Sequence, residues 1–178
     1  MRNGDIVTFN YDPFGRRIYK SVSTGGTSVF AYDGVSLIET TNFSGAAVAR
    51  YTQTQNIDEP LAELRSSTTS YYEADGLGSI TSLTSAAGAI ADTYTYDSYG
   101  NLTASSGSVP NPFSYTGREF DSETGLYFHR ARYYDPSVGK FLSEDPLGFE
   151  GGLDFYAYVG NDPVDWVDPF GHSRYLRS

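Results

Sequence analysis

The sequence has no cysteine, one methionine, one tryptophan and few charged residues, which make up 19% of its 178 positions. Without cysteine, disulfides and cysteine-ligated metal sites are excluded. Two histidines make a transition-metal site improbable, and no glycine-rich loop followed by a helical pattern indicates a nucleotide cofactor. No apolar run approaches the roughly 20 residues of a membrane span, and the first residues lack the apolar stretch of a signal peptide.

Positive charge is also scarce, because 22 acidic residues face 12 basic ones and leave a net charge of −10. This balance argues against nucleic-acid binding, which relies on cations against phosphates. In their place the chain is rich in Tyr, Phe and Gly, with 16, 11 and 19 copies. Such a composition is typical of an all-β protein and argues against disorder.

A Tyr-Asp pair or a relaxed version of it, followed by Gly, recurs along the first hundred residues. Its aspartates are Asp12, Asp33, Asp75 and Asp97, at intervals of 21, 42 and 22 residues. The doubled interval predicts a degenerate unit near residues 51–55. Each unit has a β-branched and aromatic strand, an aspartate-glycine turn and a second strand, so we expect a strip of β-hairpins with Tyr and Phe alternating onto one buried or lumen face.

The composition changes near residue 104, which divides the chain into hairpins (1–103), a C-terminal core block (104–171) and a short tail (172–178). Helical periodicity is absent from windows of 11 or more residues, so long helices are not expected. One short helix is predicted over 155–159, with Asp154 as N-cap and Gly160 as terminator, packed near Trp166.

The core block carries an ordered series of short motifs: PFSYTGREFD, ETGLY, RARYYDP, GKF, DPLG, GGL, YAY, NDP and WVDPFG. This series resembles the Rhs repeat-associated core of the Rhs/YD-repeat family. That family includes bacterial polymorphic toxins, the C components of insecticidal toxin complexes and, more distantly, teneurins. The close resemblance covers about residues 70–171, and weaker YD repeats cover 1–69.

The resemblance implies a secreted or cell-surface protein in which β-hairpins form a hollow shell around a toxic C-terminal polypeptide. In many members the core block is also an aspartyl autoprotease that cuts after the second Asp-Pro-x-Gly. Here the two copies are Asp145–Gly148 and Asp168–Gly171. The implied catalytic residues are therefore Asp145 and Asp168, and the implied cut lies between Gly171 and His172, where relatives often have Leu.

Paired carboxylates suit this chemistry, because one keeps a proton and the pair then supplies an acid and a base. A purely structural interpretation competes, since Asp-Pro-x-Gly is also a type I turn signature. Asp12–Gly15 is the same tetrapeptide as Asp168–Gly171 and lies far from the core block.

The basic residues of the core block have mainly structural interpretations. His129 lies in an aromatic stretch and is expected to be a strand residue. Arg118, Arg130 and Arg132 are expected to pair with aspartates, and one of them is a candidate for orienting a catalytic carboxylate.

Two functions therefore remain open beside each other, a structural shell segment and a protease that cuts itself once. A third is a self-assembling module that forms tubes or filaments. About five hairpin units are too few for a closed shell, so the strip edges need a longer upstream shell or further copies of the chain. The tail of seven residues is too short for a toxin, which is then deleted, cleaved away or never present.

Overall fold

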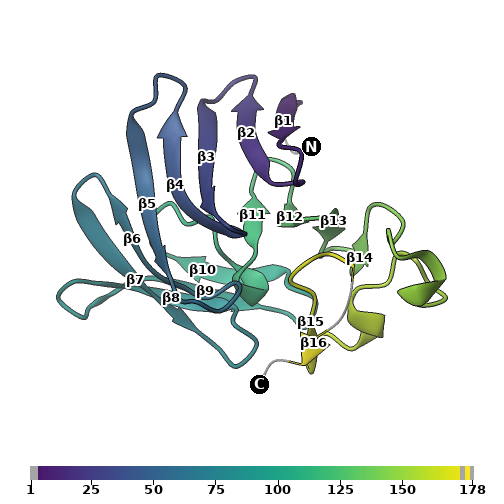
Figure 1. The fold of residues 1–178 in the computed structure, drawn as a ribbon. Coiled ribbons are helices and arrows are strands. Elements are labelled where there is room, and N and C mark those ends of the chain that lie inside the picture. The colour runs from purple at the N-terminus through teal and green to yellow at the C-terminus, as the bar shows by residue number, and fades with distance from the viewer. Residues whose placement is uncertain (1–3, 173–174, 177–178) are drawn as a thin grey trace.

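The computed structural model describes residues 4–172 and 175–176, and its strands form three antiparallel sheets (Figure 1). The largest is a ten-stranded meander in sequence order: β1 (Val7–Tyr11), β2 (Arg17–Val22), β3 (Thr27–Asp33), β4 (Ser36–Asn42), β5 (Ala47–Gln53), β6 (Pro60–Arg65), β7 (Thr68–Ala74), β8 (Ile80–Ser85), β9 (Ile90–Tyr96) and β10 (Leu102–Ser106). A second sheet contains β11 (Glu119–Asp121), β12 (Leu126–His129), β13 (Arg132–Asp135) and β14 (Lys140–Phe141). The third pairs β15 (Trp166–Val167) with β16 (Tyr175–Leu176).

The all-β prediction is confirmed. The helical elements of the described chain are three short 3-10 turns: η1 (Tyr115–Gly117), η2 (Gly148–Glu150) and η3 (Val159–Asn161). Within the same residues, no helix is long and apolar enough to cross a membrane.

The Tyr-Asp repeats form turns at one end of the strands of the long sheet, as the sequence predicts. One carboxylate oxygen of Asp12 accepts the backbone N–H groups of Phe14 and Arg16. Asp75 and Asp97 do the same for the N–H groups two and four residues further on. The degenerate unit is also a hairpin, β5–β6, but its connecting loop over 54–59 is longer and places Asp58 at a positive φ of 58°.

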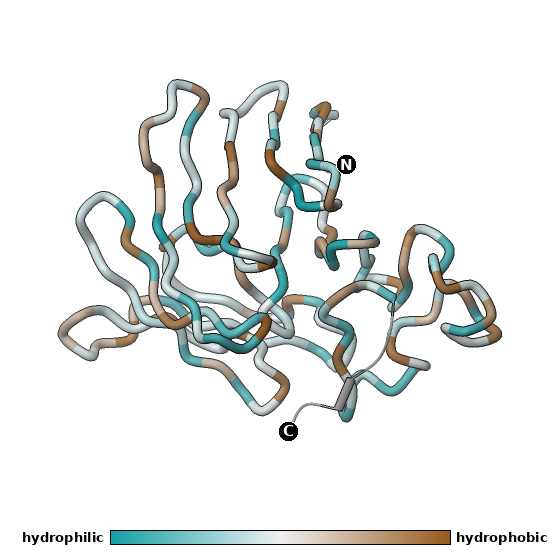
Figure 2. Tube along the Cα trace, viewed as in Figure 1, coloured by the Kyte–Doolittle hydropathy of each residue, from teal (hydrophilic) through white to brown (hydrophobic). Residues whose placement is uncertain are grey.

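The long sheet curves around the start of the core block (Figure 1). Along β5 and β7, alternate residues are buried, so that Tyr51 and Tyr72 point to one face. Both rings pack edge to face on Phe113, at centroid distances of 5.3 and 5.7 Å. Apolar and polar residues are interspersed along the strands (Figure 2), as one-faced burial requires.

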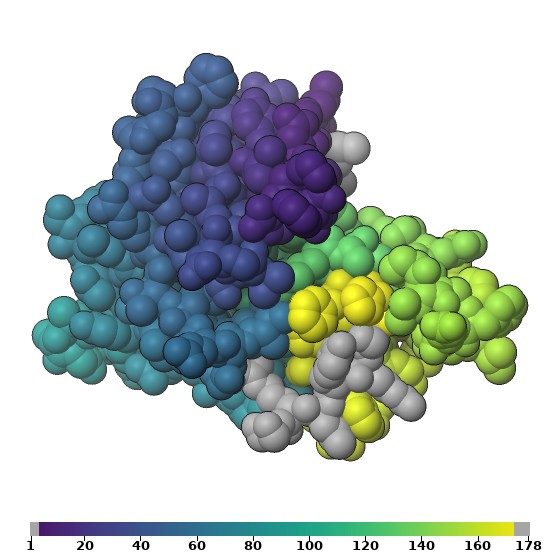
Figure 3. Space-filling model, in the orientation of Figure 1, coloured from purple at the N-terminus to yellow at the C-terminus, as the bar shows by residue number. Residues whose placement is uncertain are grey.

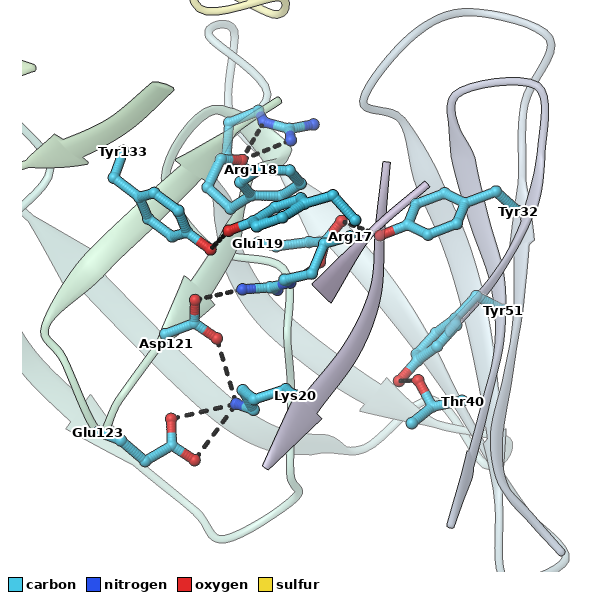
Figure 4. A network of polar contacts seen from close by, with 12 residues as sticks. Arg17, Lys20, Tyr32, Thr40, Tyr51, Arg118, Glu119, Asp121, Glu123 and Tyr133 are labelled. Atoms are coloured by element: carbon cyan, nitrogen blue, oxygen red, sulfur yellow. Dashed lines mark hydrogen bonds and ion pairs between the residues drawn. The ribbon is translucent and has the colours of Figure 1, made fainter. Parts of the chain in front are cut away.

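A buried ion cluster holds the core block against the N-terminal strands (Figure 4). Arg17, at the start of β2, pairs with Glu119 and Asp121 of β11, and Lys20 adds bonds to Asp121 and Glu123. The guanidinium of Arg17 also lies 4.9 to 5.2 Å from the ring centroids of three phenylalanines: Phe9, Phe30 and Phe128. Because removing Arg17 would leave the buried carboxylate of Glu119 without its cation, this cluster ties the small sheet to the long one.

The short helix predicted over 155–159 is wrong. Asp154 does cap one turn, with its carboxylate accepting the N–H of Tyr156. The chain then becomes extended at Tyr158, which is fully buried among the aromatic residues of the small sheet, while Ala157 forms a β-bridge with Lys140. Burial of Tyr158 and this bridge outweigh the weak preference of so short a segment for helix. Trp166 packs on the same aromatic cluster, as expected.

Candidate functional site

Asp145 and Asp168 converge on one side chain, that of Arg132. The Nη2 atom of Arg132 lies 2.9 Å from Oδ2 of Asp145 and 3.7 Å from Oδ2 of Asp168. All three side chains are almost completely shielded from solvent. Of the three arginines that the sequence offered, Arg132 is thus the one placed between the two predicted carboxylates.

The Gly171–His172 peptide lies at the same place. The Nε atom of Arg132 donates to the carbonyl oxygen of Gly171. On the other side of this peptide, Oδ1 of Asp168 accepts the N–H groups of Gly171, at 2.8 Å, and of His172, at 3.2 Å. A cation therefore contacts the carbonyl oxygen of this peptide bond, and a carboxylate contacts its nitrogen.

The position of Asp145 is set by local hydrogen bonds and by one glycine. Its Oδ1 accepts the N–H of Leu147, and its carbonyl accepts the N–H of Gly148, as an Asp-Pro-x-Gly turn predicts. Its backbone N–H donates to Phe155, which closes the loop. A Cβ at Gly151 would lie 2.7 Å from Oδ2 of Asp145, so the carboxylate occupies space that any larger residue would fill.

Arg132 is held by more than the two carboxylates. It begins β13, and its guanidinium stacks 3.7 Å from the ring centroid of Phe141. Its Nη1 donates to the carbonyl of Phe155. Burial lowers the pKa of Arg132, and the carboxylates of Asp145 and Asp168 oppose that shift, which keeps the guanidinium charged.

His129 is the last residue of β12, so the prediction of a strand residue is confirmed. Its Nδ1 lies 2.6 Å from the carbonyl oxygen of Asp168, and because a carbonyl only accepts, Nδ1 carries the proton. Burial, with Arg118 adding to it, lowers the pKa of His129 to about 3. The imidazole is therefore neutral at physiological pH and holds the backbone of Asp168 as a hydrogen-bond donor.

A pocket of about 530 Å³ opens beside these groups. Its lining includes Arg132, Asp145, Asp168 and His172, together with glycines of the 148–153 loop and Leu153. The pocket therefore borders Arg132, both carboxylates and His172, the residue that follows the Gly171–His172 peptide bond. Among residues 4–172 and 175–176, no group of three or more His, Asp or Glu side chains forms a metal-binding cluster. Figure 3 shows the segment that leads up to His172, in yellow, between the long sheet and the lime-green loop of the core block.

The sequence named the four residues that meet here, Asp145, Asp168, Gly171 and His172, and included Arg132 among its candidates. It missed Gly151, whose contact with Asp145 follows from loop packing, and it gave no signal for Asp58. The carboxylate of Asp58 pairs with both Arg118 and Arg130, across more than 50 residues of sequence.

Comparison with known proteins gives a consistent result. The family model described as Teneurin YD-shell matches residues 1–164. The chain is 30% identical over 193 residues to the double-stranded DNA deaminase toxin A of Burkholderia cenocepacia, covering 92% of this chain and 14% of the relative. It is 34% identical over 181 residues to the probable deoxyribonuclease RhsA of Dickeya dadantii, covering 97% of this chain and 13% of the relative.

Among solved structures, a crystal structure of TcdB2-TccC3-TEV superposes with a TM-score of 0.76 at 25% identity, over 95% of this chain and 9% of that one. The matched segment is thus a small part of each of these larger proteins.

Proposed function

We propose that this chain, which belongs to the teneurin YD-shell family, is a segment of a hollow β-shell that encloses a C-terminal polypeptide and cuts the chain once after Gly171. The observation that carries the cut is the convergence of Asp145, Asp168 and the Gly171 carbonyl on Arg132. The observation that favours the shell is the open edge at each side of the long sheet, where β1 pairs with β2 alone and β10 with β9 alone among the described strands.

Open edges favour a shell because their unpaired N–H and C=O groups require a neighbour. In two of the relatives this neighbour can come from the same chain, because the matched segment is only 13 to 14% of their length. We therefore expect further YD hairpins to continue the sheet. One relative is named a toxin, and a toxin must leave the cell that makes it, which supports the proposal that the assembled protein acts outside the cell.

Enclosure is tested on the longest natural protein that contains this segment. Its C-terminal polypeptide should resist an added protease while the shell is folded, and should be digested when the same polypeptide is expressed alone. Equal digestion rates for the two forms would contradict enclosure.

Edge pairing with further copies of this chain is the alternative, and the same open edges favour it. Only 19% of residues are charged, which leaves few edge lysines, while the net charge of −10 opposes association. Assembly into filaments should therefore strengthen as salt is added. Light scattering and negative-stain microscopy across salt concentrations measure this, and a monomer at every concentration rules the alternative out.

The cut would be a hydrolysis that needs only the groups described. Water attacks the carbonyl carbon of Gly171 while Arg132 stabilises the charge that grows on its oxygen. With one proton shared between the two carboxyl groups, Asp145 takes the proton of the water as the base, and Asp168 passes the shared proton to the nitrogen of His172 as the acid. The C–N bond breaks, leaving a carboxyl end at Gly171 and an amine at His172, and a proton returning from Asp145 to Asp168 restores the pair.

Intact-mass measurement tests this proposal on the full 178-residue chain made by cell-free synthesis. We expect a product that ends at Gly171 and a released peptide of seven residues, 172–178. Asp145→Asn keeps the turn geometry but cannot take the proton, so its chain should stay whole. Retention of all 178 residues by the unmodified folded chain would contradict self-cleavage.

A further inference from the structure

The turn between β12 and β13 holds the segment before the cut, residue by residue. His129 Nδ1 binds the carbonyl of Asp168, and Arg130 Nη1 donates to the carbonyl of Pro169. The backbone N–H of Ala131 then donates to the carbonyl of Phe170, at 3.2 Å, and Arg132 Nε donates to the carbonyl of Gly171. Four consecutive residues thus each bind one of four consecutive carbonyl oxygens.

This one-to-one register leaves no space for a side chain at Gly171. Its φ is +75°, and a Cβ there would overlap the carbonyl oxygen of His129. The segment before the cut therefore lies directly on the turn, and a shift by one residue would bring a side chain into this contact. The register therefore selects which carbonyl oxygen receives the hydrogen bond from Arg132 Nε, and this is the oxygen of Gly171.

Arg130 has a backbone conformation that is unfavourable for arginine. Its φ is +56°, a region in which non-glycine residues other than Asn and Asp are uncommon. Its guanidinium nevertheless makes specific contacts, because it donates to the Pro169 carbonyl and stacks 5.5 Å from the centroid of Phe170. The Phe170 ring in turn stacks on His172, the residue after the cut, at 5.8 Å and 17°.

Asp58 fixes that guanidinium from the other side. Its oxygens accept from Arg130 Nη2 at 2.7 Å and Nη1 at 3.1 Å, and also from Arg118. Burial would raise the pKa of Asp58, but the two guanidiniums outweigh burial and lower it, so the carboxylate stays charged. Asp58 belongs to the β5–β6 loop, 72 residues before Arg130, and a Cβ at Gly117 would overlap its carbonyl oxygen.

We propose that Asp58 and Arg130 are positioning residues for self-cleavage, so that the Gly171–His172 bond comes into register only when the β5–β6 loop is docked on the core block. This inference rests on the proposed cut after Gly171. Arg130 touches the segment before the cut, and Asp58 acts through Arg130. Through the contact of Asp58 with Arg130, the loop over 54–59 then makes the geometry of the site depend on the folding of the hairpin strip.

Arg130→Asn is the sharpest test, because Asn tolerates the positive φ of the turn while removing the grip on Pro169 and Phe170. In the full chain from cell-free synthesis, release of residues 172–178 should slow by about a hundredfold, the loss that a misplacement of about 1 Å can cause. Arg130→Lys is the second variant: it keeps a cation beside Asp58 but lacks the planar fork that spans Asp58 and the carbonyl, so it should also slow the cut. Asp58→Glu, which restores a carboxylate, should cut faster than Asp58→Asn.

Arg16→Asn is the matched control, since Arg16 pairs with the aspartate of the other Asp-Pro-Phe-Gly turn and donates to the Gly34 carbonyl. It should cut at the unmodified rate. A second readout uses chains kept whole by Asp145→Asn: adding Arg130→Asn should speed amide hydrogen exchange at Gly171 and His172. An unmodified cleavage rate in both Arg130 variants, with unmodified exchange in the Arg130→Asn chain, would overturn the inference while leaving the cut intact. An unmodified chain that never cuts overturns both.

Discussion

The tetrapeptide Asp-Pro-Phe-Gly occurs twice, and the two copies have opposite surroundings. At Asp12–Gly15, Phe14 is 84% exposed, and a Cβ on Gly15 would meet open space. At Asp168–Gly171, Asp168 is 3% exposed, and a Cβ on Gly171 would overlap the His129 carbonyl. Both glycines have nearly the same positive φ, 77° and 75°.

The two aspartates also use their atoms differently. The backbone carbonyl of Asp12 accepts the N–H of Gly15, and its carboxylate pairs with Arg16 in the turn. At the second copy the carboxylate of Asp168 accepts the N–H of Gly171, while its carbonyl binds His129. The same four residues thus make a free-standing hairpin turn in one place and part of a buried site in the other, because their tertiary neighbours differ.

Replacing the aspartate by asparagine should give the largest difference in cleavage rate between the two copies. Asp168→Asn removes the carboxyl that faces the nitrogen of His172, so release of residues 172–178 should fall by about a thousandfold, within the range of general acid–base catalysis. Asp12→Asn changes the turn of the other copy, which does not contact the proposed cut site, and should leave the rate unchanged. Intact-mass time courses of both variants decide this, and equal rates would remove the distinction between the copies.

Only the second copy lies near the carboxylate of Asp145, because both contact Arg132. That carboxylate fits only because residue 151 is glycine. Gly151→Ala keeps a favourable backbone, since its φ is −77°, but forces the Asp145 carboxylate to move. We expect cleavage to slow by about ten- to a hundredfold with little loss of stability. Gly76→Ala is the control, because a Cβ at Gly76 meets nothing within 4 Å. If Gly151→Ala cuts as fast as Gly76→Ala, the position of Asp145 is unimportant.

A buried histidine contacts only the second copy, and it should make stability depend on pH. Burial lowers the pKa of His129 to about 3 in the folded chain, against 6.5 for a free side chain. Between these values the unfolded chain takes up a proton that the folded one refuses, so stability is full above pH 6.5 and declines as pH falls. Over about three pH units the free energy of unfolding should fall by on the order of 4 kcal/mol, which urea unfolding at several pH values measures.

His129→Asn should lower stability at pH 8 but flatten this decline. The lowered pKa of Asp58 also removes stability as pH falls, but only as the pH approaches 3.8, the ordinary aspartate value. Burial raises the pKa of Glu63 above its ordinary value of 4.5, which adds stability as pH falls, so the difference in slope between the unmodified chain and His129→Asn is what reports His129. A decline of the same slope in His129→Asn would show that other groups cause it.

The smallest expected effect is the difference in stability loss between alanine substitutions at Gly15 and at Gly171. Gly15→Ala should cost about 1 kcal/mol for its positive φ alone. Gly171→Ala carries the same strain and an overlap with the His129 carbonyl as well, which adds about 1–3 kcal/mol. Urea unfolding at one pH measures both, and equal losses would mean that the backbone at Gly171 relaxes freely.

The sequence was a good guide wherever structure is local. Aspartate carboxylates bond to N–H groups two and four residues away, so the hairpin turns at Asp12, Asp75 and Asp97 could be predicted from spacing. The helix predicted after Asp154 failed because its continuation required Tyr158 to leave the aromatic core. There a long-range packing preference defeated a correct local cap.

The sequence by itself determined an all-β chain, its repeat turns and the residue types of the site, because alternation and turn hydrogen bonds involve close neighbours. Only the tertiary structure decided which Asp-Pro-Phe-Gly copy is buried, which arginine lies between Asp145 and Asp168, and that Asp58 holds Arg130. These contacts join residues 13 to 72 positions apart. Their partners are chosen by how the curved sheet and the core block pack, which no local pattern records.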